Sequence, residues 1–138
     1  MKLFFIPSKA LSIILYLVSL HSFFIGIGLL VLPDSLITQM GFYNYQGNFF
    51  RYQGGVFHLI MSFAYALCAY NTEKYFGLII LTLFAKFSAF IFLFSYYLLA
   101  DKVIIVLISG ICDFVMGLVV LYLVYHFKNQ KILINYKK

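Results

Sequence analysis

Four long apolar runs, separated by short polar segments, organise the sequence. They cover residues 10–32, 51–70, 75–100 and 103–127, and each is at least 20 residues long. About 20 apolar residues, at a rise of about 1.5 Å each, form a helix that crosses the roughly 30 Å hydrocarbon core of a bilayer. The pattern therefore predicts an all-α protein with four membrane-spanning helices.

The short connections predict how these helices pack. Only residues 71–74 separate the second run from the third, and only 101–102 separate the third from the fourth. Such short loops force consecutive helices to be antiparallel neighbours. Because no linker or second module is visible, we expect residues 1–138 to form a single integral membrane domain, an antiparallel four-helix transmembrane bundle.

The connection over residues 33–49 is the only one long enough to fold over the end of the bundle. Pro33 ends the first run, and Asp34 and Ser35 are candidates to cap a short helix lying along the membrane surface. Its aromatic residues are typical of the belt at a membrane–water interface. The alternative is that this loop forms a lid over an outward-facing pocket.

Composition supports the membrane interpretation. Hydrophobic residues make up 64% of the chain and charged residues 10%, whereas soluble domains carry about 25% charged residues. The net charge of +6 comes mostly from single basic residues at the ends of apolar runs. No basic patch interleaved with aromatics is present, so we expect no nucleic-acid partner.

The basic residues predict the orientation in the membrane. One side of the predicted bundle carries most of them, and the other side carries only Arg51 and Lys102. The larger group consists of Lys2, Lys9, Lys74, Lys128, Lys131, Lys137 and Lys138. Because cytoplasmic loops are enriched in Lys and Arg, both termini and the turn over 71–74 are expected in the cytoplasm.

Two opposite charges fall near the middle of the predicted membrane core. Lys86 lies about 15 Å along the third span from the cytoplasmic side, and Asp113 about 15 Å along the fourth from the outside. Each would cost about 2.5 to 3.5 kcal/mol at the bilayer centre. We therefore predict that Lys86 contacts Asp113. Such a pair has either a purely structural role or a further function.

The second run carries the most polar stripe of the chain. Arg51, Gly55, His58, Ser62 and Tyr65 recur at steps of three and four residues, which is one face of a helix. Arg51 lies at the outer boundary, where it either extends to lipid headgroups or belongs to a site. His58, about 10 Å deep, is expected to reach the layer of the predicted ion pair.

Small residues and one further histidine complete the candidates within the spans. His21 lies near the middle of the first run and is either hydrogen-bonded to a neighbouring helix or part of a ligand site. Small side chains let helix backbones approach closely in lipid. On this ground the residues expected at helix contacts are Gly26, Gly54, Gly55, Gly110 and Gly117.

Metal and thiol chemistry are not indicated. The histidines and the one carboxylate within the spans show no HxxxH or ExxH spacing, so we predict no metal site. Cys68 and Cys112 differ in predicted depth by about 12 Å, too far for a disulfide. We predict no cofactor, with a quinone or a lipid left open.

Several of these features resemble one known group. The first run ends at a proline, the second begins Arg51-Tyr52-Gln53-Gly54-Gly55, and a base and an acid lie within the third and fourth. This pattern, over residues 10–127, resembles the small four-span DoxX-like proteins, above all their uncharacterised members. The resemblance implies a four-helix membrane bundle and marks Arg51, Gly54, Gly55, Lys86 and Asp113.

The function implied by this resemblance stays open. Some members of the group resemble quinone-linked oxidoreductase subunits, and others resemble assembly or trafficking factors. The chain lacks paired cysteines, which argues against the thiol-dependent quinone reductases of similar size. A fold alone does not choose among such functions.

The leading hypothesis is therefore a non-catalytic, multi-pass membrane protein whose buried polar layer binds a small lipophilic ligand or a membrane partner. One alternative is an oxidoreductase or isomerase acting on a quinone-type or lipid substrate, with His58 or Asp113 moving the proton. Another is a proton-coupled carrier. The expected surroundings are the lipid bilayer of a bacterial inner membrane, with a homo-oligomer as one possible assembly.

Overall fold

The computed structural model describes residues 6–43 and 48–135, with side chains over 9–43 and 48–126. Within these ranges the structure is helical and contains no strand, which confirms the predicted all-α class. The helices, in chain order, are α1 (Ile6–Val31), α2 (Asp34–Gln39), α3 (Phe49–Tyr70), α4 (Phe76–Leu99) and α5 (Ile104–Asn135).

The long helices coincide with the predicted apolar runs to within a few residues, except at the end of the chain. There α5 continues to Asn135, beyond the predicted end at 127. No glycine or proline follows Gly117 before that point, so nothing in the sequence breaks the helix. Lys128 and Lys131 therefore belong to the helix rather than to a loop.

The short helix α2 follows Pro33 as expected, but its predicted capping is wrong. Pro33 itself is the N-cap residue, in an extended conformation, and no side chain caps the helix. The carboxylate of Asp34 instead contacts Arg51. A helix start without a capping side chain leaves backbone N–H groups for water or lipid headgroups.

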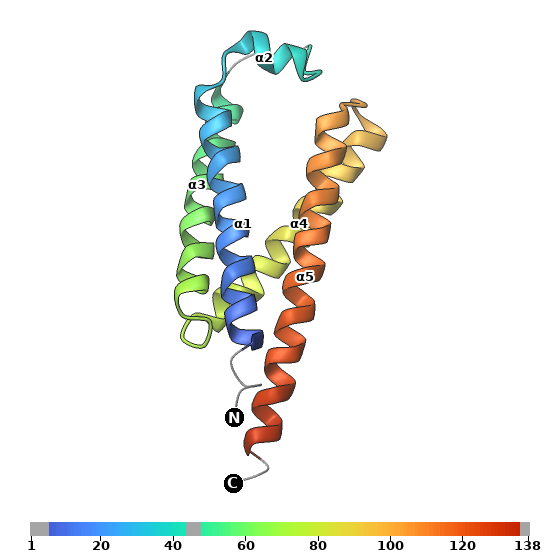
Figure 1. Ribbon diagram of the computed structural model, residues 1–138. Coiled ribbons are helices and arrows are strands. Elements are labelled where there is room, and N and C mark those ends of the chain that lie inside the picture. The colour runs from blue at the N-terminus through green and yellow to red at the C-terminus, as the bar shows by residue number, and fades with distance from the viewer. Residues whose placement is uncertain (1–5, 44–47, 136–138) are drawn as a thin grey trace.

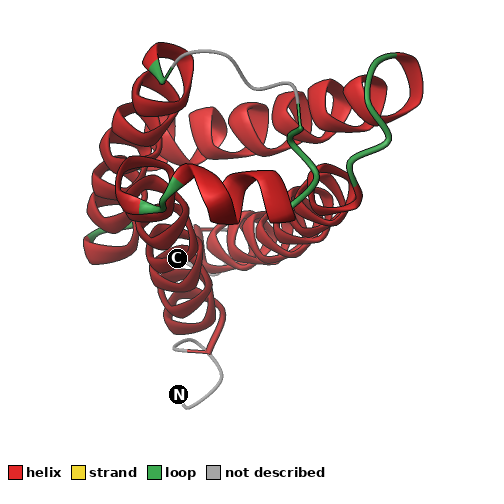
Figure 2. Cartoon of the chain, turned by 90° about the horizontal axis from the view of Figure 1, so that it is seen from above, coloured by secondary structure: helices red, strands yellow, loops and turns green. Residues whose placement is uncertain are grey.

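The four long helices form two pairs (Figure 1). α1 packs along α3, and α4 packs along α5. The pairs meet where α1 also contacts α5 and, over a shorter length, where α3 contacts α4. They converge at the end where α1 begins and diverge toward α2. Seen from above, α2 lies across the space between them (Figure 2).

The apolar core lies at the converging end. All four long helices contribute to it, and its fully buried members include Leu11, Leu15, Cys68, Ile79 and Val120. The diverging half lacks such a core and instead contains cavities, described below. Burial therefore stabilises one half of the molecule, while the other half is left open.

The outward faces of the long helices are apolar. Large side chains such as Phe63, Phe84 and Tyr122 are more than half exposed, which in water would form a far larger apolar surface than soluble proteins tolerate. Three segments, Lys9–Val31, Phe76–Leu99 and Ile104–His126, are long and apolar enough to cross a membrane. These features indicate an integral membrane protein.

The helix α3 is not one of these three segments. Its length of 22 residues is sufficient for a span, but its polar stripe lowers its apolar character. Arg51 and Ser62 on this stripe are buried against other helices rather than exposed.

Small residues bring α1 and α3 together. A Cβ atom added at Gly55 would lie 2.8 Å from Leu30 Cγ and 3.0 Å from the carbonyl oxygen of Gly26. Further along, Ser19 Oγ donates a hydrogen bond of 2.8 Å to the carbonyl oxygen of Ser62. These contacts hold the backbones close, as small residues do in membrane helix pairs.

The neighbouring glycines Gly54 and Gly55 provide a matched test of this close approach. A Cβ atom at Gly54 meets only Leu29 Cδ1, at 3.7 Å. We expect Gly55→Ala to destabilise the protein by about 1 to 3 kcal/mol, because α1 must shift. Gly54→Ala should be neutral or stabilising by up to about 1 kcal/mol, since alanine favours helix. Thermal unfolding in detergent measures both; equal melting temperatures would contradict the close contact.

Candidate functional site

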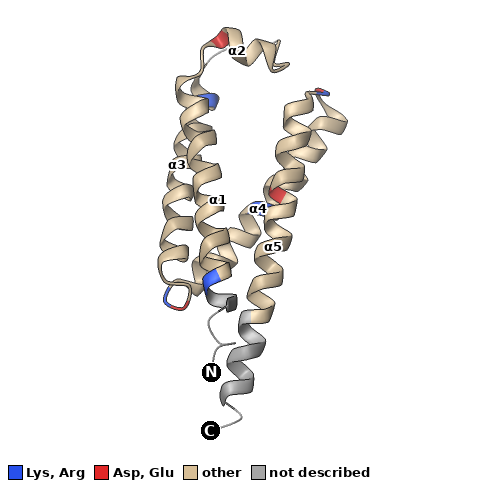
Figure 3. Cartoon of the chain, viewed as in Figure 1, with Lys and Arg blue, Asp and Glu red and all other residues tan. Residues whose placement is uncertain are grey.

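Lys86 on α4 and Asp113 on α5 form a buried ion pair. Lys86 Nζ donates a hydrogen bond of 2.6 Å to Asp113 Oδ1, and both side chains are about nine-tenths buried. Figure 3 shows this opposed pair part-way along the two helices, whereas the other described charges lie toward the ends of the molecule. The contact predicted from the α4–α5 hairpin is therefore present.

The ion pair has an aromatic neighbour on a third helix. Lys86 Nζ lies 5.5 Å from the centre of the Tyr65 ring on α3, within the range of a cation–π interaction. Tyr65 is 3% exposed. The ammonium group is thus held by a carboxylate and by an aromatic face, which partly replace the water it loses on burial.

His58 on α3 is held by Ser22 on α1. Ser22 Oγ lies 3.1 Å from the carbonyl oxygen of His58 and 3.1 Å from Nδ1 of the same ring. Both contacts are hydrogen bonds only when the single hydroxyl proton of Ser22 goes to the carbonyl oxygen, which cannot donate, and Nδ1–H donates to Ser22 Oγ. In the neutral imidazole this arrangement leaves Nε2 as a hydrogen-bond acceptor.

A central cavity of about 480 Å³ separates the two helix pairs above the ion pair. Its walls are apolar, α2 and the segment after it lie over it, and its polar groups are the rings of His21 and His58, the hydroxyl of Ser109 and the carboxylate of Asp113. The apolar lining includes Phe24, Ile25, Gly28, Leu29, Leu32, Ile37, Met40, Phe42, Ala89, Phe92, Leu93, Ile105 and Val106.

His21 faces this central cavity. Among the described residues its ring has no hydrogen-bond partner, so the expectation of a histidine bonded to a neighbouring helix does not describe it. It lies one residue before Ser22 on α1 and therefore points to a different side of the helix. The structure brings His21, His58 and Asp113 to one cavity, as the depth estimates suggest.

A second, smaller cavity of about 150 Å³ lies behind the ion pair. His58 and Asp113 line both cavities, whereas Lys86 lines only the smaller one. The ammonium group therefore lies behind the carboxylate as seen from the central cavity. The carboxylate of Asp113, which only accepts hydrogen bonds when ionised, is thus the charged group nearest the central cavity.

Arg51 is buried at the start of α3 and pairs with α2. It is 7% exposed, and its Nη1 lies 2.9 Å from Asp34 Oδ1 on α2. Its Nε is the single buried side-chain nitrogen or oxygen without a partner among residues 9–43 and 48–126. The guanidinium group is therefore bound to α2, and its contact with lipid headgroups stays a prediction.

Arg51 also lines a third cavity, of about 460 Å³, beside the central one. The two share Leu29, Ile37, Phe42, Phe92, Leu93 and Val106 as lining residues. They are therefore adjacent parts of one apolar space between the helix pairs. Arg51 lies at its outer end, and the two histidines and Asp113 lie at its inner end.

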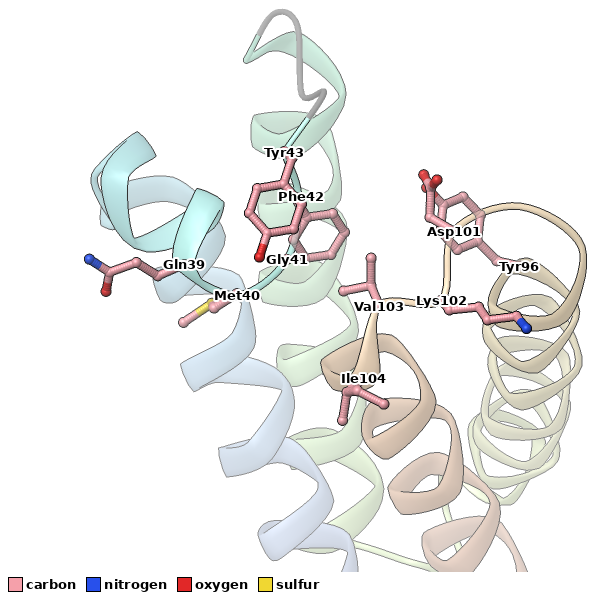
Figure 4. A pocket seen from close by; sticks show the side chains of 10 residues that line it. All are labelled: Gln39, Met40, Gly41, Phe42, Tyr43, Tyr96, Asp101, Lys102, Val103 and Ile104. Carbon is pink, nitrogen blue, oxygen red and sulfur yellow. The ribbon is translucent and has the colours of Figure 1, made fainter.

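An outward-facing pocket of about 540 Å³ adjoins this space between the end of α2 and the α4–α5 turn. Figure 4 shows Tyr43 and Phe42 on one side and Val103, Lys102 and Asp101 on the other. Tyr96 donates a hydrogen bond of 2.8 Å to Asp101. Asp101 and Lys102 make this pocket more polar than the central cavity.

Two parts of the site were not expected from the sequence. Ser22 is one, since a lone serine in an apolar run indicates no more than close helix packing. Ile37, Met40 and Phe42 close the outer side of the cavity, which fits the lid alternative for the loop. Their signal was an apolar spacing in a short loop, too weak to interpret alone.

Metal and disulfide chemistry find no support in the described part of the chain. Within residues 9–43 and 48–126, no group of three or more His, Cys, Asp or Glu side chains is placed to hold a metal ion. Cys68 is buried, Cys112 is exposed, and both are free thiols. The sites of interest are therefore the ion pair, the two histidines and the cavity above them.

Substitutions of the ion pair compare the effect on stability of removing one charge with that of removing both. Lys86→Met leaves Asp113 as an unpaired buried charge, and we expect a loss of about 3 to 5 kcal/mol in the free energy of unfolding. Lys86→Leu combined with Asp113→Leu removes both charges, and its stability should lie within about 1.5 kcal/mol of wild type or above it. Unfolding in detergent checks this; a double variant as unstable as Lys86→Met would contradict it.

Comparisons with known proteins leave the chain without a match. No family model, no curated protein and no solved structure matches it. The resemblance to DoxX-like proteins therefore stays a prediction. The residues that carry this resemblance occupy three places: Arg51 lies beneath α2, Gly54 and Gly55 face α1, and Lys86 pairs with Asp113.

Proposed function

We propose that α3 is a fourth membrane span and that the chain is an antiparallel four-helix transmembrane bundle. Three observations support this: α3 has 22 residues, it packs along α1 for most of its length, and its polar stripe is turned inward. Buried polar residues reduce its mean hydropathy without exposing charge to lipid. This proposal extends the three apolar helices to a complete four-span topology.

We further propose that the start of α1, the α3–α4 turn and the end of α5 lie in the cytoplasm. Lys9 and Lys74 are at that end, whereas Arg51 and Lys102 are at the other. The positive-inside rule favours this orientation. α2 and the outward-facing pocket then lie at the external surface, in keeping with the proposed bacterial inner membrane.

Cysteine labelling tests this topology. With Cys68 and Cys112 replaced by alanine, we expect a cysteine at Lys102 to react with a membrane-impermeant maleimide added outside intact cells. A cysteine at Glu73 should react only after the membrane is opened, because the α3–α4 turn faces the cytoplasm. Equal labelling of the two positions in intact cells would contradict a four-span topology with this orientation.

The function best supported is the binding of a small lipophilic molecule in the central cavity. The observation that carries this proposal is a cavity of about 480 Å³ with apolar walls and a polar inner end formed by His21, His58 and Asp113. Ligand cavities typically measure roughly 300 to 1,000 Å³ and combine apolar walls with a few polar groups. The chain is thus proposed as a multi-pass membrane protein that binds rather than transforms its ligand.

Access from the bilayer also supports a lipophilic ligand. Phe24 and Phe92 line the central cavity and are 63% and 66% exposed. In a membrane these side chains face lipid, so the cavity opens beside them toward the acyl chains. A ligand dissolved in the bilayer reaches the site without crossing water.

A second candidate is an oxidoreductase or isomerase that acts on a quinone-type or lipid substrate. The position of the His58 ring and the Asp113 carboxylate at the same cavity favours it, because proton transfer needs a titratable group within reach of the substrate. No redox-active thiol pair accompanies them in the described residues. Binding is therefore the leading function, and any chemistry depends on a co-substrate.

A pair of glycine substitutions tests the central cavity. Gly28 lines it, and a Cβ atom there meets only Leu32 Cδ1 at 3.6 Å; Gly77 has nothing within 4 Å and lies far from the cavity on α4. Gly28→Leu should fill the cavity without disturbing the fold, whereas Gly77→Leu should leave it unchanged. Both replace glycine by leucine within a helix.

The readout is the lipophile that copurifies with each protein, measured by mass spectrometry of the detergent extract. Wild type and Gly77→Leu should carry the same enriched species, and Gly28→Leu should carry at least about tenfold less, because its cavity is occupied. No enriched lipophile in wild type, or equal amounts in all three proteins, would overturn the proposed function.

A further inference from the structure

We propose that the ligand of the central cavity carries a hydroxyl group, which donates one hydrogen bond to an acceptor at the polar end of the cavity, Nε2 of His58 or Oδ2 of Asp113. This inference rests on the proposed lipophile-binding function and names the chemical class of its ligand. The class is a lipophilic alcohol or phenol, as opposed to a ketone, ester or ether of the same shape. The reason is that two acceptor atoms at the cavity, one on His58 and one on Asp113, receive no hydrogen bond from a described residue.

The first acceptor is Nε2 of His58. The Ser22 hydroxyl gives its single proton to the His58 carbonyl oxygen, so Nδ1 carries the imidazole proton and donates to Ser22. Within residues 9–43 and 48–126, Arg51 Nε alone is buried without a partner. His58 Nε2 also makes no hydrogen bond to a described residue, yet it is not among the buried atoms without a partner. It is therefore not buried, and it is open to the cavities that its ring lines.

The second acceptor is Oδ2 of Asp113. The ion pair occupies Oδ1, and no described residue donates to Oδ2. Asp113 lines the central cavity, but Lys86 does not. The carboxylate thus presents a free oxygen to the cavity while the ammonium group stays on the far side. An ionised carboxylate only accepts hydrogen bonds.

The remaining polar groups of the cavity do not reverse this preference. The Ser109 hydroxyl both donates and accepts, and no hydrogen bond from a described residue sets the tautomer of His21. The cavity thus contains two groups that only accept, on His58 and Asp113, and two that either donate or accept, Ser109 and His21. A ligand with a hydroxyl satisfies a fixed acceptor, whereas a ligand with only acceptor oxygens leaves both fixed acceptors unpaired, which is costly in an apolar site.

Matched probes test the inference. Farnesol and farnesyl methyl ether share their apolar chain and differ by one hydroxyl proton and one methyl group. Binding of each is measured by competition against tritiated farnesol, with the full-length protein in phosphatidylcholine vesicles and protein-free vesicles as the partition blank. Wild type should bind farnesol about tenfold more tightly, the value of one hydrogen bond made in an apolar site.

Serine variants connect this preference to the histidine tautomer. Ser22→Ala keeps His58, but the contact that fixes which ring nitrogen carries the proton is lost. The preference for farnesol should therefore fall to less than about threefold. Ser19→Ala is the matched control, because Ser19 donates to a carbonyl oxygen across the same α1–α3 interface and does not touch His58. It should keep the full preference. His58→Phe removes the first acceptor outright, so its preference for farnesol should fall at least as far as that of Ser22→Ala.

The outcomes separate the two proposals. If neither probe binds wild type, the lipophile-binding function fails, and this inference fails with it. If both bind equally, or the ether binds more tightly, the cavity still accepts a lipophile but the hydroxyl preference is overturned. A preference that Ser22→Ala and Ser19→Ala reduce to the same extent overturns the role assigned to the His58 tautomer.

Discussion

The requirement that a buried charge be paired determines most of this structure. Lys86 and Asp113 lie on neighbouring helices at matching depth, with 2.6 Å between Nζ and Oδ1. In a medium of low dielectric constant neither charge tolerates separation from the other. Their pairing fixes the register of α4 against α5, and this register in turn sets which residues of α5 face α1 and α3.

The two helix pairs are held together by different means. Hydroxyl groups and glycines join α1 to α3, so the backbones lie close and polar atoms are satisfied across the interface. Phe87, Phe90 and Phe114 pack between α4 and α5 beside the ion pair. Each helix pair is thus held together by contacts between its own two helices. The pairs share an apolar core only at one end, and a cavity remains between them at the other.

Parts of this arrangement follow from the sequence by simple geometry. The depths of Lys86 and Asp113 and the short turn between their helices suffice to predict their contact. The polar stripe of α3 indicates that His58 reaches the same layer. The pairing of α1 with α3 does not follow, because the loop over 33–49 is long enough to allow several partners. The contact of Arg51 with Asp34 was hidden for the same reason, since it depends on where that loop places α2.

The separation of core and cavity has a consequence for dynamics. Amide groups of α1 near Leu11 and Leu15, and of α5 near Val120, lie in the packed half, where opening requires global unfolding. Helix ends near α2 lie in the half without a core and open at much lower free energy. Hydrogen exchange along α1 would thus be graded, slow at its beginning and fast toward Val31. The proposed ligand would then enter by local opening of the half without a core, while the packed half keeps its structure.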